Sequence, residues 1–161
     1  MNGYDLKNEA SNQKKSNKKL LSKLKKEKGF LVDNLFQEAH NDVFSCTDCL
    51  KCANCCKTTG PLFTNKDIDR ISKHLNIRPV KLISKYLKID EEGDYILQST
   101  PCEFLGEDNY CSIYYVRPKA CSEYPHTNRK KQHQIFNLNL KNTEVCPAVF
   151  KIFEKIKIKV K

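Results

Sequence analysis

The chain has 161 residues, a formal net charge of +10 and no tryptophan, and hydrophobic residues make up 39% of it. This length suits one domain with a modest core, and because the hydrophobic fraction is below the usual globular range, we expect part of the chain to lie outside that core. No apolar run approaches the roughly 20 residues of a membrane-spanning helix and no secretory signal is visible, so we expect a cytoplasmic protein with no membrane contact.

Residues 1–28 are rich in lysine. They hold nine Lys against Asp5, Glu9 and Glu27, and their large aliphatic residues after Met1 are four leucines. Because lysines repel one another and are rarely buried, we predict a basic, flexible arm or a solvated helix here. Such an arm is a candidate to contact RNA or an acidic partner, while a solubilising tail is the simpler explanation. We therefore divide the chain into this arm and one domain of residues 29–161.

Several later segments have the pattern of helices. A helix from about residue 30 to residue 44 is predicted, with a buried stripe of Leu31, Leu35, Ala39 and Val43 that Val32 and Phe36 flank. Thr64 stands three residues before Asp67, which is a capping-box-like start for a helix, and residues 76–79 end that helix and start another. These two short helices are expected to form a hairpin. Cys146 and Pro147 open a final helix, whose predicted buried stripe is Val149, Ile152, Phe153 and Ile156.

Two short segments are predicted to be strands. Residues 95–98 follow a turn at 91–94 and are mostly apolar. Apolar side chains between about Gln134 and Leu140 favour a second strand, which is expected to pair with the first. The predicted sheet therefore has two strands.

Nine cysteines give the chain its most specific signal. Five of them lie within residues 46–56, and a spacing of three repeats before Cys55 and Cys56 stand side by side. Such close cysteines are poorly placed for disulfides with one another, whereas thiolates three positions apart can bind one metal ion from a single turn of backbone. In a chain without a visible secretory signal, this composition favours metal ligands over a disulfide framework.

The other four cysteines follow later in the chain. Cys102 and Cys111 stand on either side of a predicted tight loop, which would present two sulfurs together. Cys121 lies on a short predicted helix that begins at Pro118. Cys146 lies at the start of the final helix, where the helix dipole favours the thiolate. All four are therefore candidate ligands.

The cysteine motifs are linked in a fixed order. They read Cys49-x-x-Cys52-x-x-Cys55-Cys56, then Cys102-x-Phe104-Leu105, then Cys111-x-Ile113-Tyr114-x-x-Arg117-Pro118-x-x-Cys121-x-x-Tyr124-Pro125. This series resembles the YkgJ-type cysteine-cluster family, also called the CxxCxxCC family, from about Cys46 to Cys146. The resemblance implies zinc or iron binding in a small bacterial cytoplasmic protein. Flagellin lysine N-methylases are similar in their cysteine set, which implies an alternative, enzymatic function.

We take eight cysteines as candidate metal ligands and leave out Cys46, which lies outside the family pattern. The eight are Cys49, Cys52, Cys55, Cys56, Cys102, Cys111, Cys121 and Cys146. They fit two four-cysteine zinc sites, one zinc site with an iron–sulfur cluster, or one polynuclear cluster with bridging thiolates. The protein would chelate or handle the metal as its function, or the metal would only stabilise the fold.

The predicted fold is a small, metal-stabilised α+β domain of mostly short helices, with a minor two-stranded β element, around a cysteine metal centre. Our first functional hypothesis is chelation of zinc or iron. The second is an iron–sulfur-dependent protein-modifying enzyme, and the third is a zinc-stabilised nucleic-acid-binding module that uses the basic arm. The sequence shows no P-loop, nucleophile elbow or paired carboxylates, so we assign no catalytic residue and leave enzymatic activity open.

Overall fold

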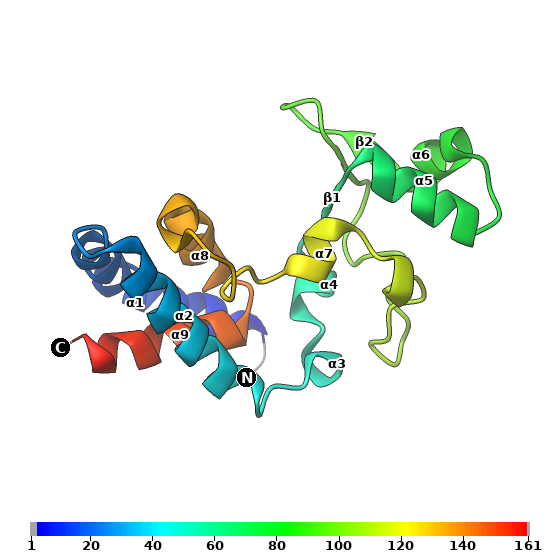
Figure 1. The fold of residues 1–161 in the computed structure, drawn as a ribbon. Coiled ribbons are helices and arrows are strands. Elements are labelled where there is room, and N and C mark those ends of the chain that lie inside the picture. The colour runs from blue at the N-terminus through cyan, green and yellow to red at the C-terminus, as the bar shows by residue number, and fades with distance from the viewer. Residues whose placement is uncertain (1–2, 161) are drawn as a thin grey trace. The chain divides into compact units, whose positions relative to one another are not determined.

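The computed structural model describes residues 3–160, and these fall into two compact units, each with its own hydrophobic core (Figure 1). The helical unit combines the chain up to Asp48 with the chain from Pro125 onward. The cysteine unit is Cys49–Tyr124. These boundaries fall at other positions than the predicted one at residue 28.

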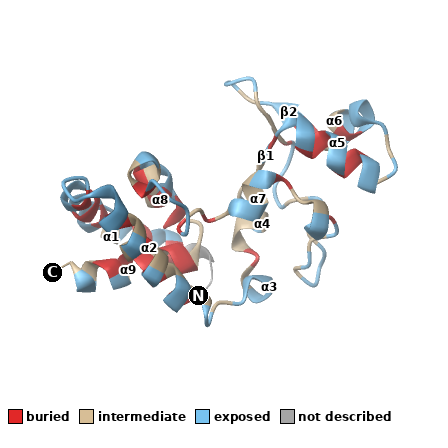
Figure 2. Cartoon of the chain, viewed as in Figure 1, coloured by how far each residue is buried: buried red, intermediate tan, exposed pale blue. Residues whose placement is uncertain are grey.

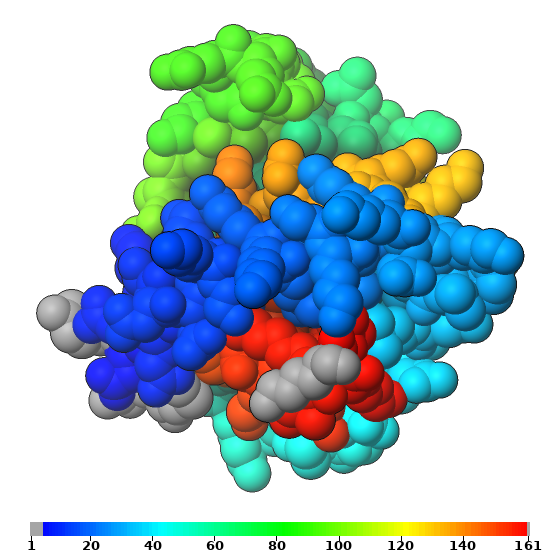
Figure 3. Space-filling model, turned by 90° about the vertical axis from the view of Figure 1, so that its left-hand side faces the viewer, coloured from blue at the N-terminus to red at the C-terminus, as the bar shows by residue number. Residues whose placement is uncertain are grey.

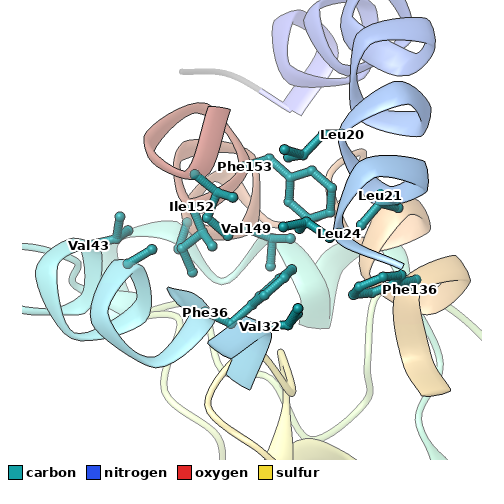
Figure 4. Close-up of a cluster of buried hydrophobic side chains, with 13 residues drawn as sticks. Leu20, Leu21, Leu24, Val32, Phe36, Val43, Phe136, Val149, Ile152 and Phe153 are labelled. Atoms are coloured by element: carbon teal, nitrogen blue, oxygen red, sulfur yellow. The ribbon is translucent and has the colours of Figure 1, made fainter. Parts of the chain in front are cut away.

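The helical unit is built from helices throughout its described residues. Its elements are α1 (Gly3–Leu24), α2 (Gly29–Phe44), the 3-10 helix η2 (Gln132–Ile135), α8 (Phe136–Asn142) and α9 (Pro147–Lys159). All four α-helices contribute side chains to one core, in which Phe36 lies between Phe136 and Phe153 with ring centroids 6.1 Å away in each case (Figure 4). The predicted helix of residues 30–44 is confirmed as α2, and the predicted final helix as α9.

The stripes that these two helices bury are only partly the predicted ones. Val149, Ile152, Phe153 and Ile156 of α9 are all fully buried, as the periodicity predicts. In α2 the buried residues are Val32, Phe36, Ala39 and Val43, whereas Leu31, predicted to lie on the stripe, is 46% exposed. The stripe begins one residue later than predicted because the two phenylalanines of α8 and α9 pack around Phe36.

Helix α1 differs from the flexible or solvated segment expected for residues 1–28. Leu20, Leu21 and Leu24 belong to the core of the helical unit, and Leu6 is also fully buried. Leucines one turn apart form a narrow apolar stripe, so the helix packs on one side while its lysines stay exposed on the others. Figure 3 shows α1 in dark blue against α9 in red, and a hydrogen bond of 2.9 Å from Lys157 Nζ to Gln13 Oε1 joins them.

The strand predicted for Gln134–Leu140 is wrong. These residues form η2 and α8, and no described strand pairs them with residues 95–98. The helix buries Phe136 and Asn139, three residues apart, while Leu138 is 40% exposed. The Asn139 side-chain amide donates to Gln132 Oε1 at 2.7 Å in the interior. Because Asn139 and Gln132 are polar and buried, the positions of the apolar residues alone do not show the helical period.

The cysteine unit holds the only sheet among the described residues. Its elements are α3 (Cys49–Cys52), α4 (Asn54–Thr58), β1 (Leu62–Phe63), α5 (Asn65–His74), α6 (Pro79–Tyr86), β2 (Leu87–Ile89), β3 (Tyr95–Leu97), η1 (Tyr114–Val116) and α7 (Lys119–Glu123). The sheet is antiparallel with the order β1-β3-β2, so it has three strands where two were predicted. Ile96 of β3 pairs with Leu62 on one side and with Lys88 on the other.

The fold class is confirmed as a small, mostly helical α+β protein. The hairpin of α5 and α6 packs on the sheet around a core that includes Phe63, Ile71, Leu82 and Phe104. The predicted capping box is present, because Thr64 and Asp67 exchange both hydrogen bonds at the start of α5. Among the described residues, no helix combines the length and the apolar character needed to cross a bilayer.

Candidate metal centre

The first four candidate ligands lie on two very short helices. Helix α3 begins at Cys49 and ends at Cys52, and Cys55 and Cys56 lie in α4. Ala53 joins the helices with φ of 46°, a left-handed conformation that is unfavourable for a residue with a side chain. The CxxCxxCC segment is therefore not one continuous helix, because Ala53 redirects the chain between its two pairs of cysteines.

The second group is tied to the first by the backbone. The Cys102 N–H donates to the Cys56 carbonyl at 2.8 Å. An antiparallel bridge pairs Leu105 with Cys111, and the Gly106 N–H closes the loop between them by donating to the Tyr110 carbonyl at 2.8 Å. As predicted, Cys102 and Cys111 flank a tight loop. This loop stands next to the end of the CxxCxxCC segment.

Cys121 lies in the middle of α7, which begins at Lys119 with Pro118 as the preceding cap residue. The position of this helix depends on Asp67, a residue that sequence reasoning identified only as part of a local cap. Asp67 Oδ1 accepts from the Lys119 N–H at 3.1 Å and from Arg70 Nη2 at 2.6 Å. Arg70 also donates to the Val116 carbonyl, at 3.3 Å. One buried carboxylate thus fixes the start of the helix that carries Cys121.

Asp67 is held as a carboxylate in spite of its burial. Burial raises the pKa of Asp67, but hydrogen bonds from Thr64, Arg70 and Lys119 together outweigh it and bring the pKa below the usual 3.8. No sequence signal reveals the contact with Lys119, which lies 52 residues away. The Thr64–Asp67 box was the only part of this network visible in the sequence.

Three cysteines of the cysteine unit have raised pKa values, and the charge of Cys56 contributes to each of them. Burial and then the charges of Cys56, Cys102 and Cys111 raise the pKa of Cys121 to about 12. Burial, together with Cys56 and Cys111, raises the pKa of Cys102 to about 11. Burial is also the main cause of the raised pKa of Cys111, which again feels the charge of Cys56. Cys102, Cys111 and Cys121 therefore all lie within electrostatic reach of Cys56.

Cys56 has the opposite shift. A hydrogen bond with Cys55, whose Sγ lies 4.0 Å from Cys56 Sγ, is the main cause that lowers the pKa of Cys56 to about 7, and Lys57 acts in the same direction while burial opposes it. Arg117 lies close enough to lower the pKa of Cys111 and of Cys121. It also donates to the Tyr114 carbonyl at 2.7 Å and stacks on the Tyr114 ring, which agrees with an anchoring role at the end of η1.

The donor set fits zinc or iron in its chemistry. All nine cysteines are thiols without disulfides, and thiolates are the ligands that zinc and iron–sulfur centres use. The cysteine-bearing helices α3, α4 and α7 hold no buried residue, so hydrophobic burial does little to fix them (Figure 2). Helices of four or five residues are unstable alone, so they need another source of stability. Among residues 3–160, no group of three or more Cys, His, Asp or Glu side chains stands ready-made around a metal position.

Two cysteines lie in the helical unit. Cys146 is the cap residue before α9, is half-buried against the core, and donates its N–H to the Asn142 carbonyl at 2.8 Å. Cys46, which we left out of the ligand set, is exposed after α2 and contacts the Val43 carbonyl. The other seven cysteines all lie in the cysteine unit.

The nearest histidine to the cluster in sequence, His40, has a packing role. His40 Nδ1 lies 2.8 Å from Thr127 Oγ1, and its ring stacks on Phe44 with centroids 4.3 Å apart. Burial lowers the pKa of His40. These contacts account for its orientation within the helical unit.

A family model matches residues 48–147, which include all eight candidate ligands. Its description is CxxCxxCC, "putative zinc- or iron-chelating domain". The chain belongs to this family. The match to the CxxCxxCC family covers more than half of the chain and both groups of cysteines, so the resemblance drawn from the motifs is confirmed. No curated protein and no solved structure gives a significant match to the chain.

Proposed function

We propose that this CxxCxxCC protein chelates zinc or iron through cysteine thiolates. The ligands would come from the eight cysteines of the family pattern, Cys49, Cys52, Cys55, Cys56, Cys102, Cys111, Cys121 and Cys146. The observation that most supports the proposal is the link between Cys56 and later cysteines: the Cys102 N–H donates to the Cys56 carbonyl at 2.8 Å, and the charge of Cys56 helps to raise the pKa of Cys102, Cys111 and Cys121. A bound cation would remove the repulsion among these sulfurs when they ionise.

The weak local anchoring of α3, α4 and α7 further supports the proposal. These helices carry five of the ligands and contribute no buried residue to the core. A structural zinc site contributes on the order of 10 kcal/mol, which is enough to fix segments that lack apolar contacts. We therefore expect metal loading to order the cysteine-bearing segments more than the α5–α6 hairpin, whose own core includes Ile71 and Leu82.

Metal analysis of protein purified without oxygen tests the proposal. We expect stoichiometric zinc or iron, and a loss of metal when Cys52, Cys56, Cys102 or Cys121 is changed singly to Ser. Cys46→Ser is the matched control, because it removes an exposed thiol outside the family pattern and should leave the metal content unchanged. Full metal retention in all four ligand variants would overturn the assignment. A visible absorption spectrum separates an iron–sulfur cluster from colourless zinc.

We also propose that the protein works in a reducing compartment such as the cytoplasm. The support is the set of nine cysteines without a disulfide, since such thiols persist where thioredoxin and glutathione keep them reduced. Alkylation of intact cells followed by mass spectrometry tests this, because it should label the cysteines as thiols or metal-protected thiols and find no disulfide-linked peptides.

A further inference from the structure

We propose that one corner of the helical unit binds single-stranded nucleic acid. This surface, which we term the basic corner, joins two cationic runs that are far apart in the sequence, at the end of α1 and before η2. Its six members are all exposed: Lys25, Lys26, Lys28, Arg129, Lys130 and Lys131. All six lie in the helical unit, and none of them is a candidate metal ligand or stands next to one in the sequence.

Two sets of contacts bring the runs together. The ring of His133 lies with Nε2 3.1 Å from the Leu24 carbonyl, at the end of α1. Asp33, in the first turns of α2, accepts hydrogen bonds from the backbone N–H groups of Lys131 and Gln132 at 2.8 and 2.9 Å. The segment 129–131 is therefore fixed beside residues 25–28 by contacts on both sides. In Figure 3 the orange part of the chain borders the blue part accordingly.

The positive charge of the basic corner is not neutralised within the unit. Among residues 3–160, its six cations form no ion pair, and the only carboxylates beside them in sequence or by contact are Glu27 and Asp33. Lysines of α9 contrast with this, because Lys155 pairs with Asp42 at 3.2 Å and Lys159 with Glu38 at 2.9 Å. Clustered cations without partners raise the local concentration of polyanions and release counterions from them.

An exposed aromatic residue favours single-stranded nucleic acid as the polyanion that binds here. Phe30 follows Lys28 at the start of α2 and is 61% exposed. Basic grooves with an exposed aromatic ring are the features by which proteins bind single strands, since phosphates contact the cations and a base stacks on the ring. A membrane surface fits less well, because the apolar residues that α1 would need to insert, such as Leu6 and Leu24, are buried in the protein.

Fluorescence anisotropy of the full chain with a labelled single-stranded oligouridylate of about 20 nucleotides tests the proposal. We expect binding that weakens steeply between about 50 and 300 mM KCl. Lys25→Gln with Lys26→Gln, and separately Arg129→Gln with Lys130→Gln, should each lower the slope of log K against log salt by about 1.4, since each single-strand phosphate contact contributes about 0.7. Phe30→Ala should weaken binding by about fivefold or more.

The control is Lys81→Gln with Lys88→Gln, which removes the same charge from exposed positions of the cysteine unit. This control variant should leave unchanged both the affinity for the oligouridylate and the slope of log K against log salt. The proposal is overturned if the Arg129 and Lys130 pair behaves like this control, or if Phe30→Ala has no effect. It is also overturned if anionic vesicles or a poly-glutamate peptide bind to the corner while the RNA does not.

Discussion

The buried carboxylate of Asp67 is expected to hold together the cap of α5 and the start of the cysteine-bearing helix α7. Its two oxygens accept four hydrogen bonds: Oδ2 from the Thr64 N–H and hydroxyl at 2.9 and 2.6 Å, and Oδ1 from Arg70 and the Lys119 N–H at 2.6 and 3.1 Å. Asp67→Asn keeps the shape of the side chain but turns one acceptor into a donor, so it removes the bonds at one end whichever way the amide lies.

The expected cost follows from these bonds. Losing two accepted hydrogen bonds costs about 2 kcal/mol, at roughly 1 kcal/mol each. The ion pair with Arg70 adds little, because the Arg70 side chain is 42% exposed and solvent screens it. We therefore expect Asp67→Asn to lower the free energy of unfolding of the cysteine unit by about 2 kcal/mol, and to lower metal affinity because α7 is no longer fixed.

The same effect has a defined pH dependence. Since the pKa of Asp67 in the folded protein is below 3.8, its contribution to stability is fully present above pH 3.8 and is lost as the pH falls through the folded-state pKa. The stability gap between the native protein and Asp67→Asn should therefore narrow as the pH is lowered below 3.8. Above that pH the gap should be constant.

Urea unfolding followed by far-ultraviolet circular dichroism measures the gap, because the chain has no tryptophan to report by fluorescence. Amide exchange at Lys119 gives the local readout, and this N–H should exchange faster in the variant. Asp69→Asn is the matched control, as it makes the same change on an exposed residue of α5 and should shift stability by less than about 0.5 kcal/mol. If Asp67→Asn is no more destabilising than this control, the role given to Asp67 is wrong.

Three further predictions concern backbone strain, the helical core and the metal. Ala53→Gly should change the free energy of unfolding by less than about 0.5 kcal/mol, because relief of the left-handed backbone offsets the added flexibility. Ala39→Gly in the buried interior of α2 should instead lower the free energy of unfolding by about 1.5 kcal/mol or more. If urea unfolding gives equal costs for the two variants, the backbone at Ala53 is not strained. Phe36→Ala should destabilise the helical unit by about 3–5 kcal/mol, against a small effect for exposed Phe30→Ala, with thermal unfolding as the measure. Removing metal with a chelator should speed amide exchange in α3, α4 and α7 more than in α5 and α6, and uniform protection would count against a bound metal there.

The comparison of sequence and structure is clearest at the helices. The period of α9 was readable because every residue of its buried stripe is apolar. The helical period of α8 was not readable, because Asn139 and Gln132 are buried as a hydrogen-bonded polar pair. A search for apolar residues does not count such polar residues as buried positions. In α1 the many lysines concealed a stripe of leucines whose burial depends on partners beyond residue 130.

The sequence by itself determined the family, the order and spacing of the cysteines, the capping box at Thr64 and the tight loop between Cys102 and Cys111, because each of these is a local pattern of residue types. Tertiary structure alone decided that the two ends of the chain form one helical unit, that the Cys102 N–H donates to the Cys56 carbonyl, and that Asp67 holds α7. These features rest on contacts between residues far apart in the chain, whose free energies depend on packing and burial that no local pattern encodes.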